Sequence, residues 1–217
     1  TLIAETGASA IHVSRCYEPW EMELEKAVAR ACEAAGAAFR VFGGRLLFEP
    51  EAIVTGDGKP YRVFTPFWKA CLAAGAPRTP LPQPKRLRFA EAKSDRLEVL
   101  KLLATRPDWA QGLRDTWQPG EARALARLGT FIKDRLANYA DNRSRVDIDA
   151  TSRLSPHLHF GEISPNQVWS AVGHAMSDNA RADRSAESYL REFGWCEFSY
   201  HLLHHFPNMP TEPLRPE

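Results

Sequence analysis

The stretch DATSRLSPHLHFGEISPNQVW, residues 149–169, decides the interpretation of this chain because it contains two helix starts of different character. Its first half places three hydroxyl groups and one guanidinium directly before Pro156, which suits the first turn of a helix. These four residues are Thr151, Ser152, Arg153 and Ser155. Ser155 is positioned to cap the helix. Free N–H groups and an arginine at a helix start also attract phosphate. Two interpretations stay open, an ordinary capped helix and a diphosphate site.

The second half of the stretch is a structural signal. Ser164 followed three residues later by Gln167 matches a capping box, and Ile163 and Val168 are spaced for a hydrophobic staple. Pro165 takes the first helical position, where its missing N–H costs nothing. We expect this half to fix the start of a helix and to carry no chemistry.

Composition sets limits on the class of protein. The chain has 217 residues, and 28 Lys and Arg against 27 Asp and Glu give a formal net charge of +1, so nucleic acid must bind a local basic patch. Four scattered cysteines match neither a metal motif nor a disulfide framework, which favours reduced thiols and a cytoplasmic location. No apolar run reaches the roughly 20 residues that span a bilayer, so we expect no membrane insertion.

The first third of the chain alternates between strand and helix patterns. We expect strands at residues 10–13, 38–42 and 45–50, a helix over residues 20–35 ended by Gly36, and a short helix over residues 65–75. Strands that alternate with helices predict a parallel, doubly wound α/β sheet.

The rest of the chain is different in character. Four prolines within residues 76–84 exclude a regular helix or a central strand and predict a linker. Beyond the linker helical periodicity dominates, so we expect an all-α portion. The helical patterns cover residues 95–104, 120–143, 164–176 and 186–206.

The last of these helices carries the second group of candidate site residues. At about 100° per residue, one helix face collects Tyr189, Glu192, Trp195, Cys196 and Ser199. An indole beside a carboxylate could stack on a nucleic-acid base and bind its polar edge. An amphipathic core helix gives the same pattern. Both alternatives stay open.

Residues 138–164 and 189–207 closely resemble the flavin-binding domain of DNA photolyases and cryptochromes. Residues 15–28 and 58–75 resemble the later half of the α/β antenna domain in the same family. The resemblance implies an antenna portion over residues 1–75, a Pro-rich linker region over residues 76–115 and part of the FAD-binding domain over residues 116–217. It also implies a fragment that lacks the first antenna strands and most of the later half of the FAD domain.

Site residues follow from the resemblance position by position. It implies FAD contacts from Tyr139, Tyr189 and the run Thr151, Ser152, Arg153, Leu154 and Ser155. It implies that Glu192 hydrogen-bonds a flipped-out pyrimidine dimer, that Trp195 stacks on the dimer, and that Arg143 meets the DNA backbone. Glu21 falls near an antenna-pigment position, but its neighbour is Trp20 in place of an amide, so a folate or a deazaflavin is not assigned. Cys196 stands where many relatives have arginine.

The implied activity is that of a deoxyribodipyrimidine photo-lyase, a carbon–carbon lyase that acts on UV-damaged DNA. Light-excited reduced FAD donates an electron to a cyclobutane dimer, and the electron returns after the ring splits. We expect a monomer. We also expect no metal, because the pair His201 and His205 has no general-base glutamate between its two members. The alternatives are a cryptochrome-type signalling flavoprotein and a flavin-free scaffold, and we expect no activity from the chain alone.

Overall fold

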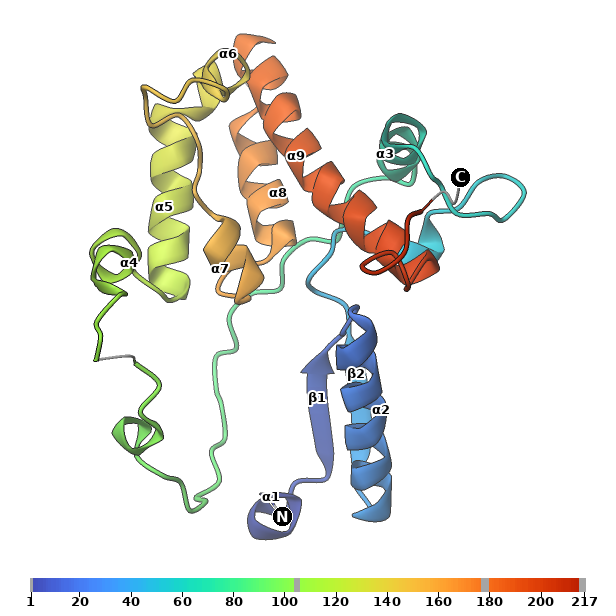
Figure 1. Ribbon diagram of the computed structural model, residues 1–217, viewed down its shortest axis with the longest axis vertical. Helices are drawn as coiled ribbons and strands as arrows, with labels where there is room; N and C mark the ends of the chain where they lie inside the picture. The colour runs from blue at the N-terminus through green and yellow to red at the C-terminus, as the bar shows by residue number, and fades with distance from the viewer. Residues whose placement is uncertain (1, 104–105, 177–179, 215–217) are drawn as a thin grey trace.

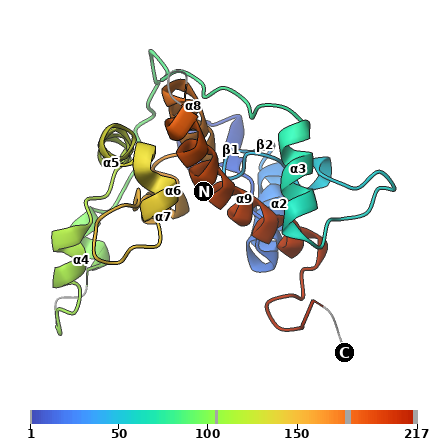
Figure 2. The same ribbon diagram turned by 90° about the horizontal axis from the view of Figure 1, so that it is seen from above.

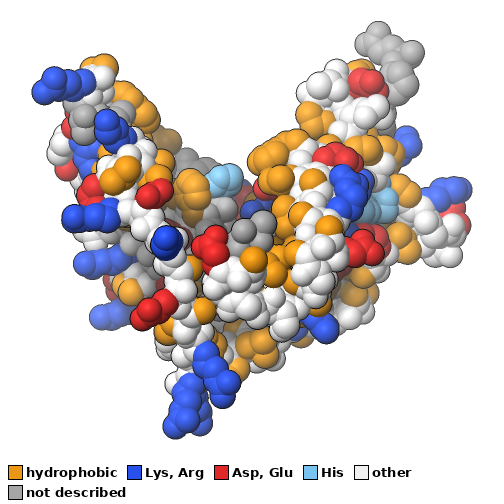
Figure 3. All heavy atoms as spheres, turned by 90° about the horizontal axis from the view of Figure 1, so that it is seen from below, with side chains coloured by type: hydrophobic (Ala, Val, Ile, Leu, Met, Phe, Trp, Pro, Cys, Tyr) orange, Lys and Arg blue, Asp and Glu red, His pale blue; other side chains and the backbone are white. Residues whose placement is uncertain are grey.

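The computed structural model describes residues 2–103, 106–176 and 180–214. A small α/β lobe, residues 2–42, lies below a helical lobe in Figure 1. The α/β lobe consists of α1 (Leu2–Thr6), β1 (Ala10–Ser14), α2 (Pro19–Ala34) and β2 (Ala38–Phe42). Viewed from below, the molecule has two arms with a hollow between them (Figure 3).

The two strands confirm the predicted parallel pairing. β1 pairs with β2 in register from Ala10 opposite Ala38 to Ser14 opposite Phe42. A parallel pair needs a crossover, and α2 supplies it, beginning with Pro19 and ending just before Gly36, whose φ is +70°. The α/β portion followed by a helical portion is the predicted fold class.

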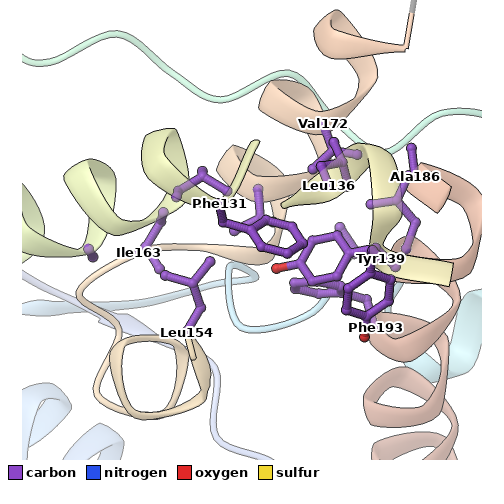
Figure 4. Packing of buried hydrophobic residues seen from close by; sticks show 14 residues of the cluster. Phe131, Leu136, Tyr139, Leu154, Ile163, Val172, Ala186 and Phe193 are labelled. Carbon is purple, nitrogen blue, oxygen red and sulfur yellow. The ribbon is translucent and has the colours of Figure 1, made fainter. Parts of the chain in front are cut away.

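The helical lobe is built around one long helix, α9 (Ala180–His205). The other elements are α4 (Gln111–Thr116), α5 (Glu121–Asp134), η3 (Leu136–Asn138), α6 (Tyr139–Asn142), α7 (Ser155–His159) and α8 (Pro165–Ala175). Side chains from α5, α6, α8 and α9 form the main core, in which Phe131, Val168 and Val172 are fully buried (Figure 4). The predicted capping box begins α8, since the Ser164 hydroxyl accepts the Gln167 N–H at 3.2 Å.

A second core joins α9 to α3 (Phe64–Ala73), and the two helices lie side by side in Figures 1 and 2. The buried carboxylate of Glu197 accepts the N–H groups of Leu47 and Phe48 at 2.9 and 3.0 Å. The buried His201 Nε2 accepts the Tyr61 N–H at 3.0 Å. Leu47, Phe48, Tyr61 and helix α3 therefore contact α9, and the domain boundaries drawn from the sequence stay a prediction.

Three local expectations are wrong. Residues 45–50 form no strand, because Glu197 takes the N–H groups of Leu47 and Phe48 that a strand would need, and only the 3₁₀ turn η1 (Pro50–Ala52) follows. Within residues 95–103 only η2 (Leu97–Leu100) forms, because its apolar side chains are exposed and a short helix needs packing; residue 104 lies outside the described residues.

Ser155 is the third correction. It is the first residue of α7, Leu154 precedes the helix, and no side chain caps it. Separately, no helix among the described residues is long and apolar enough to cross a membrane.

Gly194 permits the close approach of α9 to α3, and this contact gives a testable prediction. A Cβ at Gly194 would lie 2.6 Å from Trp68 Cε3, a carbon of a nearly buried ring, so the ring would have to shift. Alanine gains about 1 kcal/mol of helix propensity over glycine, whereas overpacking costs roughly 1–3 kcal/mol. We expect Gly194→Ala to lower the free energy of unfolding by about 1 kcal/mol in urea titrations.

The matched control is Gly129→Ala in α5, where an added Cβ meets nothing within 4 Å. Here the propensity term acts alone, so we expect a gain of about 0.5–1 kcal/mol. Equal gains from the two substitutions would show that Trp68 does not limit the packing of α9.

Candidate functional site

The structure brings together two predicted site residues from distant parts of the chain. Arg143, at the end of α6, forms an ion pair with Glu192 on α9 through its Nη1. Each side chain is about one-third exposed, and the Arg143 guanidinium lies 5.8 Å from the centre of the Tyr139 ring. Glu192, which is predicted to hydrogen-bond the pyrimidine dimer, is therefore held by Arg143, which is predicted to meet the DNA backbone.

Trp195 lies one helical turn beyond Glu192 and remains 47% exposed. Phe64 of α3 stacks on it, with ring centroids 3.7 Å apart and an angle of 8° between the planes. The Arg191 guanidinium also lies over the Phe64 ring, at 5.4 Å. One indole face is thus covered by a buried phenyl ring, which holds the plane of the indole while much of the side chain stays accessible.

The loop before α7 carries most of the predicted flavin residues. Thr151 and Ser155 are exposed, Ser152 is nearly buried, and the side chain of Leu154 is buried in the core, so only its backbone can face a ligand. Arg153 has φ +51°, a left-handed conformation that is uncommon for a residue with a side chain. Its Nε pairs with Asp149 at 3.1 Å. Strained residues of this kind concentrate at ligand sites.

Tyr139 and Tyr189 form an aromatic group with Phe131 at the centre of the helical lobe. The two tyrosine rings meet edge to face with centroids 5.1 Å apart, and both side chains are almost fully buried (Figure 4 labels Tyr139). Burial raises the pKa of both hydroxyl groups, which stay protonated at neutral pH. Among the described residues, the buried Tyr189 Oη has no hydrogen bond of ordinary geometry.

Glu21 lies apart from these residues, in the α/β lobe. Its carboxylate pairs with Arg45 at 3.2 Å, while the neighbouring Trp20 donates from Nε1 to Glu18 at 2.8 Å. Cys196 is exposed beside Trp195. His201 has its pKa lowered to about 4 by burial and binds a backbone N–H, which explains it as a neutral structural histidine.

Sequence analysis missed Phe64 as a member of the site. A phenylalanine in an apolar helix pattern is ordinary core, and nothing local indicates that a residue of α3 reaches a tryptophan on α9. It also missed the pairing of Arg143 with Glu192. Only the family resemblance singled out both residues, and neither spacing nor charge pattern predicted their contact.

Comparison with known proteins identifies the family of the chain. The DNA photolyase family model matches residues 1–85. The deoxyribodipyrimidine photo-lyase of Agrobacterium fabrum is 42% identical over 212 residues, which are 96% of this chain and 43% of that protein. Cryptochrome-1 of Arabidopsis thaliana is 31% identical over 223 residues, 98% of this chain and 32% of that protein.

Solved structures agree. A bacterial class III photolyase from Agrobacterium tumefaciens superposes with a TM-score of 0.88 at 41% identity, covering 97% of this chain and 44% of that one. The chain belongs to the DNA photolyase and cryptochrome family. It spans less than half the length of these relatives.

Proposed function

We propose that this chain supplies one wall of the flavin and lesion site of a light-dependent DNA repair enzyme that splits cyclobutane pyrimidine dimers. The observation that carries the proposal is the accessible pair of Glu192 and Trp195 on α9, in which the indole is backed by Phe64. A flipped-out base needs an aromatic plane for stacking and a hydrogen-bonding group for its polar edge.

The residues present fit FAD. The hydroxyl groups and guanidinium at residues 151–155 suit a diphosphate, and among the described residues the buried Tyr189 Oη makes no hydrogen bond of ordinary geometry, with the Ser152 hydroxyl as its neighbour. Bound FAD would supply the light-driven electron that opens the dimer. Residues 151–155 would bind and orient the cofactor, with Tyr139 and Tyr189 packed beside it. No pigment is assigned to Glu21.

The protein residues at the lesion would act through position and charge. Trp195 would stack on the extruded pyrimidines and exclude water from one side. Glu192 would hydrogen-bond the dimer and stabilise charge that develops on it, a form of electrostatic preorganisation. Because Arg143 holds Glu192 in this structure, we propose that DNA binding draws Arg143 toward a phosphate and releases the carboxylate.

Further expectations belong to the same proposal. We propose UV-damaged DNA as the partner and a monomeric state. We also propose a cytoplasmic location, which the four free cysteines of the described chain favour because oxidising compartments promote disulfides. No metal is proposed.

The first experiment is an absorption spectrum of the purified protein with its intact mass, followed by irradiation with dimer-containing DNA. We expect a visible flavin band and light-dependent repair where the intact mass exceeds the 24.4 kDa of residues 1–217, and no repair from residues 1–217 alone. A flavin band without repair would overturn the repair proposal in favour of the signalling alternative represented among the relatives by cryptochrome-1. If a protein whose intact mass exceeds that of residues 1–217 carries no flavin, the cofactor proposal is overturned.

A further inference from the structure

A groove of about 340 Å³ runs along the outer side of α5, away from the pair of Glu192 and Trp195. Arginines line it along its length: Arg123 and Arg127 on the helix and Arg135 just beyond its end. Thr116 and Thr130 add hydroxyl groups, and Asp149 is its one acidic lining residue among the described part of the chain. None of the predicted flavin, lesion or antenna residues lines this groove.

The charges of the groove are only partly neutralised. Asp149 pairs with Arg135 at 2.9 Å and also with Arg153 at 3.1 Å, so its single charge is shared between two guanidinium groups. Within the described ranges, Arg123 and Arg127 take part in no ion pair. The groove therefore carries a local positive charge on a chain whose formal net charge is only +1.

The spacing of the arginines suits an extended anion. Arg123 and Arg127 are four positions apart on α5, a helical rise of roughly 6 Å, and Arg135 directly follows the last residue of the helix. Because the groove holds three guanidinium groups and one carboxylate, a chain of phosphates can meet more of its positive charge than a single phosphate can.

An aromatic ring lies beside the middle arginine. The Arg127 guanidinium is 5.2 Å from the centre of the Trp117 ring, and Trp117 is only half-buried. This contact holds Arg127 over the connection between α4 and α5. Trp117 does not itself line the groove but lies beside it through Arg127, and an aromatic plane next to a positive groove suits the binding of single-stranded nucleic acid without sequence preference.

From these observations we propose that the α5 groove binds a single-stranded phosphodiester segment, with Arg123 and Arg127 on successive phosphates and Trp117 as a stacking plane. The groove ends at the loop that carries the predicted flavin residues, because Arg135 donates to the Thr151 carbonyl at 3.3 Å. The binding needs neither flavin nor light. It therefore stands apart from the repair proposal.

The test is the salt dependence of binding to an undamaged single-stranded oligonucleotide, measured in the dark by fluorescence anisotropy. Each phosphate contact on a single strand contributes about 0.7 to the slope of log K against log salt. We expect Arg123→Gln/Arg127→Gln to reduce the slope by about 1.4 and Arg123→Gln alone by about 0.7. The single variant removes an exposed side chain, so it keeps the test valid if loss of Arg127 disturbs Trp117.

The matched control is Arg86→Gln/Arg88→Gln, which removes two exposed arginines from the extended segment after α3. We expect the control to leave the slope within about 0.3 of the unchanged protein, because neither residue lines the groove. An unchanged slope in both α5 variants, or an equal reduction in the control, would overturn the proposal. Inorganic diphosphate is added as a competitor, with sulfate at the same concentration as its control. If diphosphate displaces the oligonucleotide and sulfate does not, the groove is a compact diphosphate site, and the proposal is also overturned.

Discussion

Replacing Trp195 with alanine is expected to weaken the binding of dimer-containing duplex DNA by about 5- to 150-fold, because stacking of one base on an aromatic side chain contributes roughly 1–3 kcal/mol. Binding of undamaged duplex should change little, because only an extruded lesion reaches the indole. The measurement is the ratio of the two Kd values by fluorescence anisotropy. Trp195→Phe, which keeps an aromatic plane, should restore most of the ratio.

The structure supplies two controls. Trp20 is 64% exposed and lies on α2 in the α/β lobe, so Trp20→Ala removes an accessible indole of the same kind without touching the site. It should leave the ratio unchanged. Phe64→Leu keeps apolar volume in the second core but removes the ring that stacks on Trp195, so the ratio should fall without loss of the fold.

These variants can also contradict the assignment. If Trp195→Ala weakens damaged and undamaged DNA equally, Trp195 contributes general affinity and does not recognise the lesion. If Phe64→Leu leaves the ratio intact, the stack does not position the indole. Circular dichroism of each variant separates either result from unfolding.

Elements with local signals could be predicted from sequence. Helix α2 has Pro19 at its start and Gly36 after its end, and α8 has a capping box whose two partners are three residues apart. The helical spacing of Tyr189, Glu192 and Trp195 also follows from geometry alone. In each case the deciding interactions lie within one or two turns of the chain.

Other features depend on partners that spacing does not reveal. The backbone at Leu47 and Phe48 resembles a strand in sequence, yet its N–H groups bind a carboxylate 150 and 149 residues away. The leucines at residues 97–103 repeat like a helix, but their side chains are exposed in the structure. At the site, Arg143 and Glu192 are 49 residues apart. Tertiary contacts override local pattern in all three cases.

Glu197 is expected to make the stability of the fold depend on pH between about 4.5 and 7. Burial is the main cause that raises the pKa of this carboxyl from 4.5 to about 7, and the nearby charge of Glu49 adds to it, while the N–H groups of Leu47 and Phe48 oppose it. The pKa is raised on folding, so the stability from the protonated form is fully present below pH 4.5. It is lost as pH rises through 7.

The magnitude follows from the size of the shift. A change of one pKa unit corresponds to about 1.4 kcal/mol, so full ionisation of Glu197 in the folded state costs roughly 3 kcal/mol. Glu197→Gln cannot ionise. The free energy of unfolding of the variant relative to the unchanged protein should therefore rise by about 2.5 kcal/mol between pH 5 and pH 8, as measured by urea titration at each pH.

The absolute stability of the variant is a separate quantity. The amide can present its oxygen to only one of the two N–H groups, and its NH₂ group then faces the other donor, which lowers stability by about 1–3 kcal/mol at every pH. This loss is the same at every pH, so it cancels when the free energies of unfolding at pH 5 and pH 8 are compared. Glu187→Gln removes an exposed carboxylate from the same helix and is the matched control. If Glu197→Gln matches that control, then the carboxylate that joins α9 to residues 47 and 48 does not titrate in this range, and the coupling of the two segments is insensitive to pH.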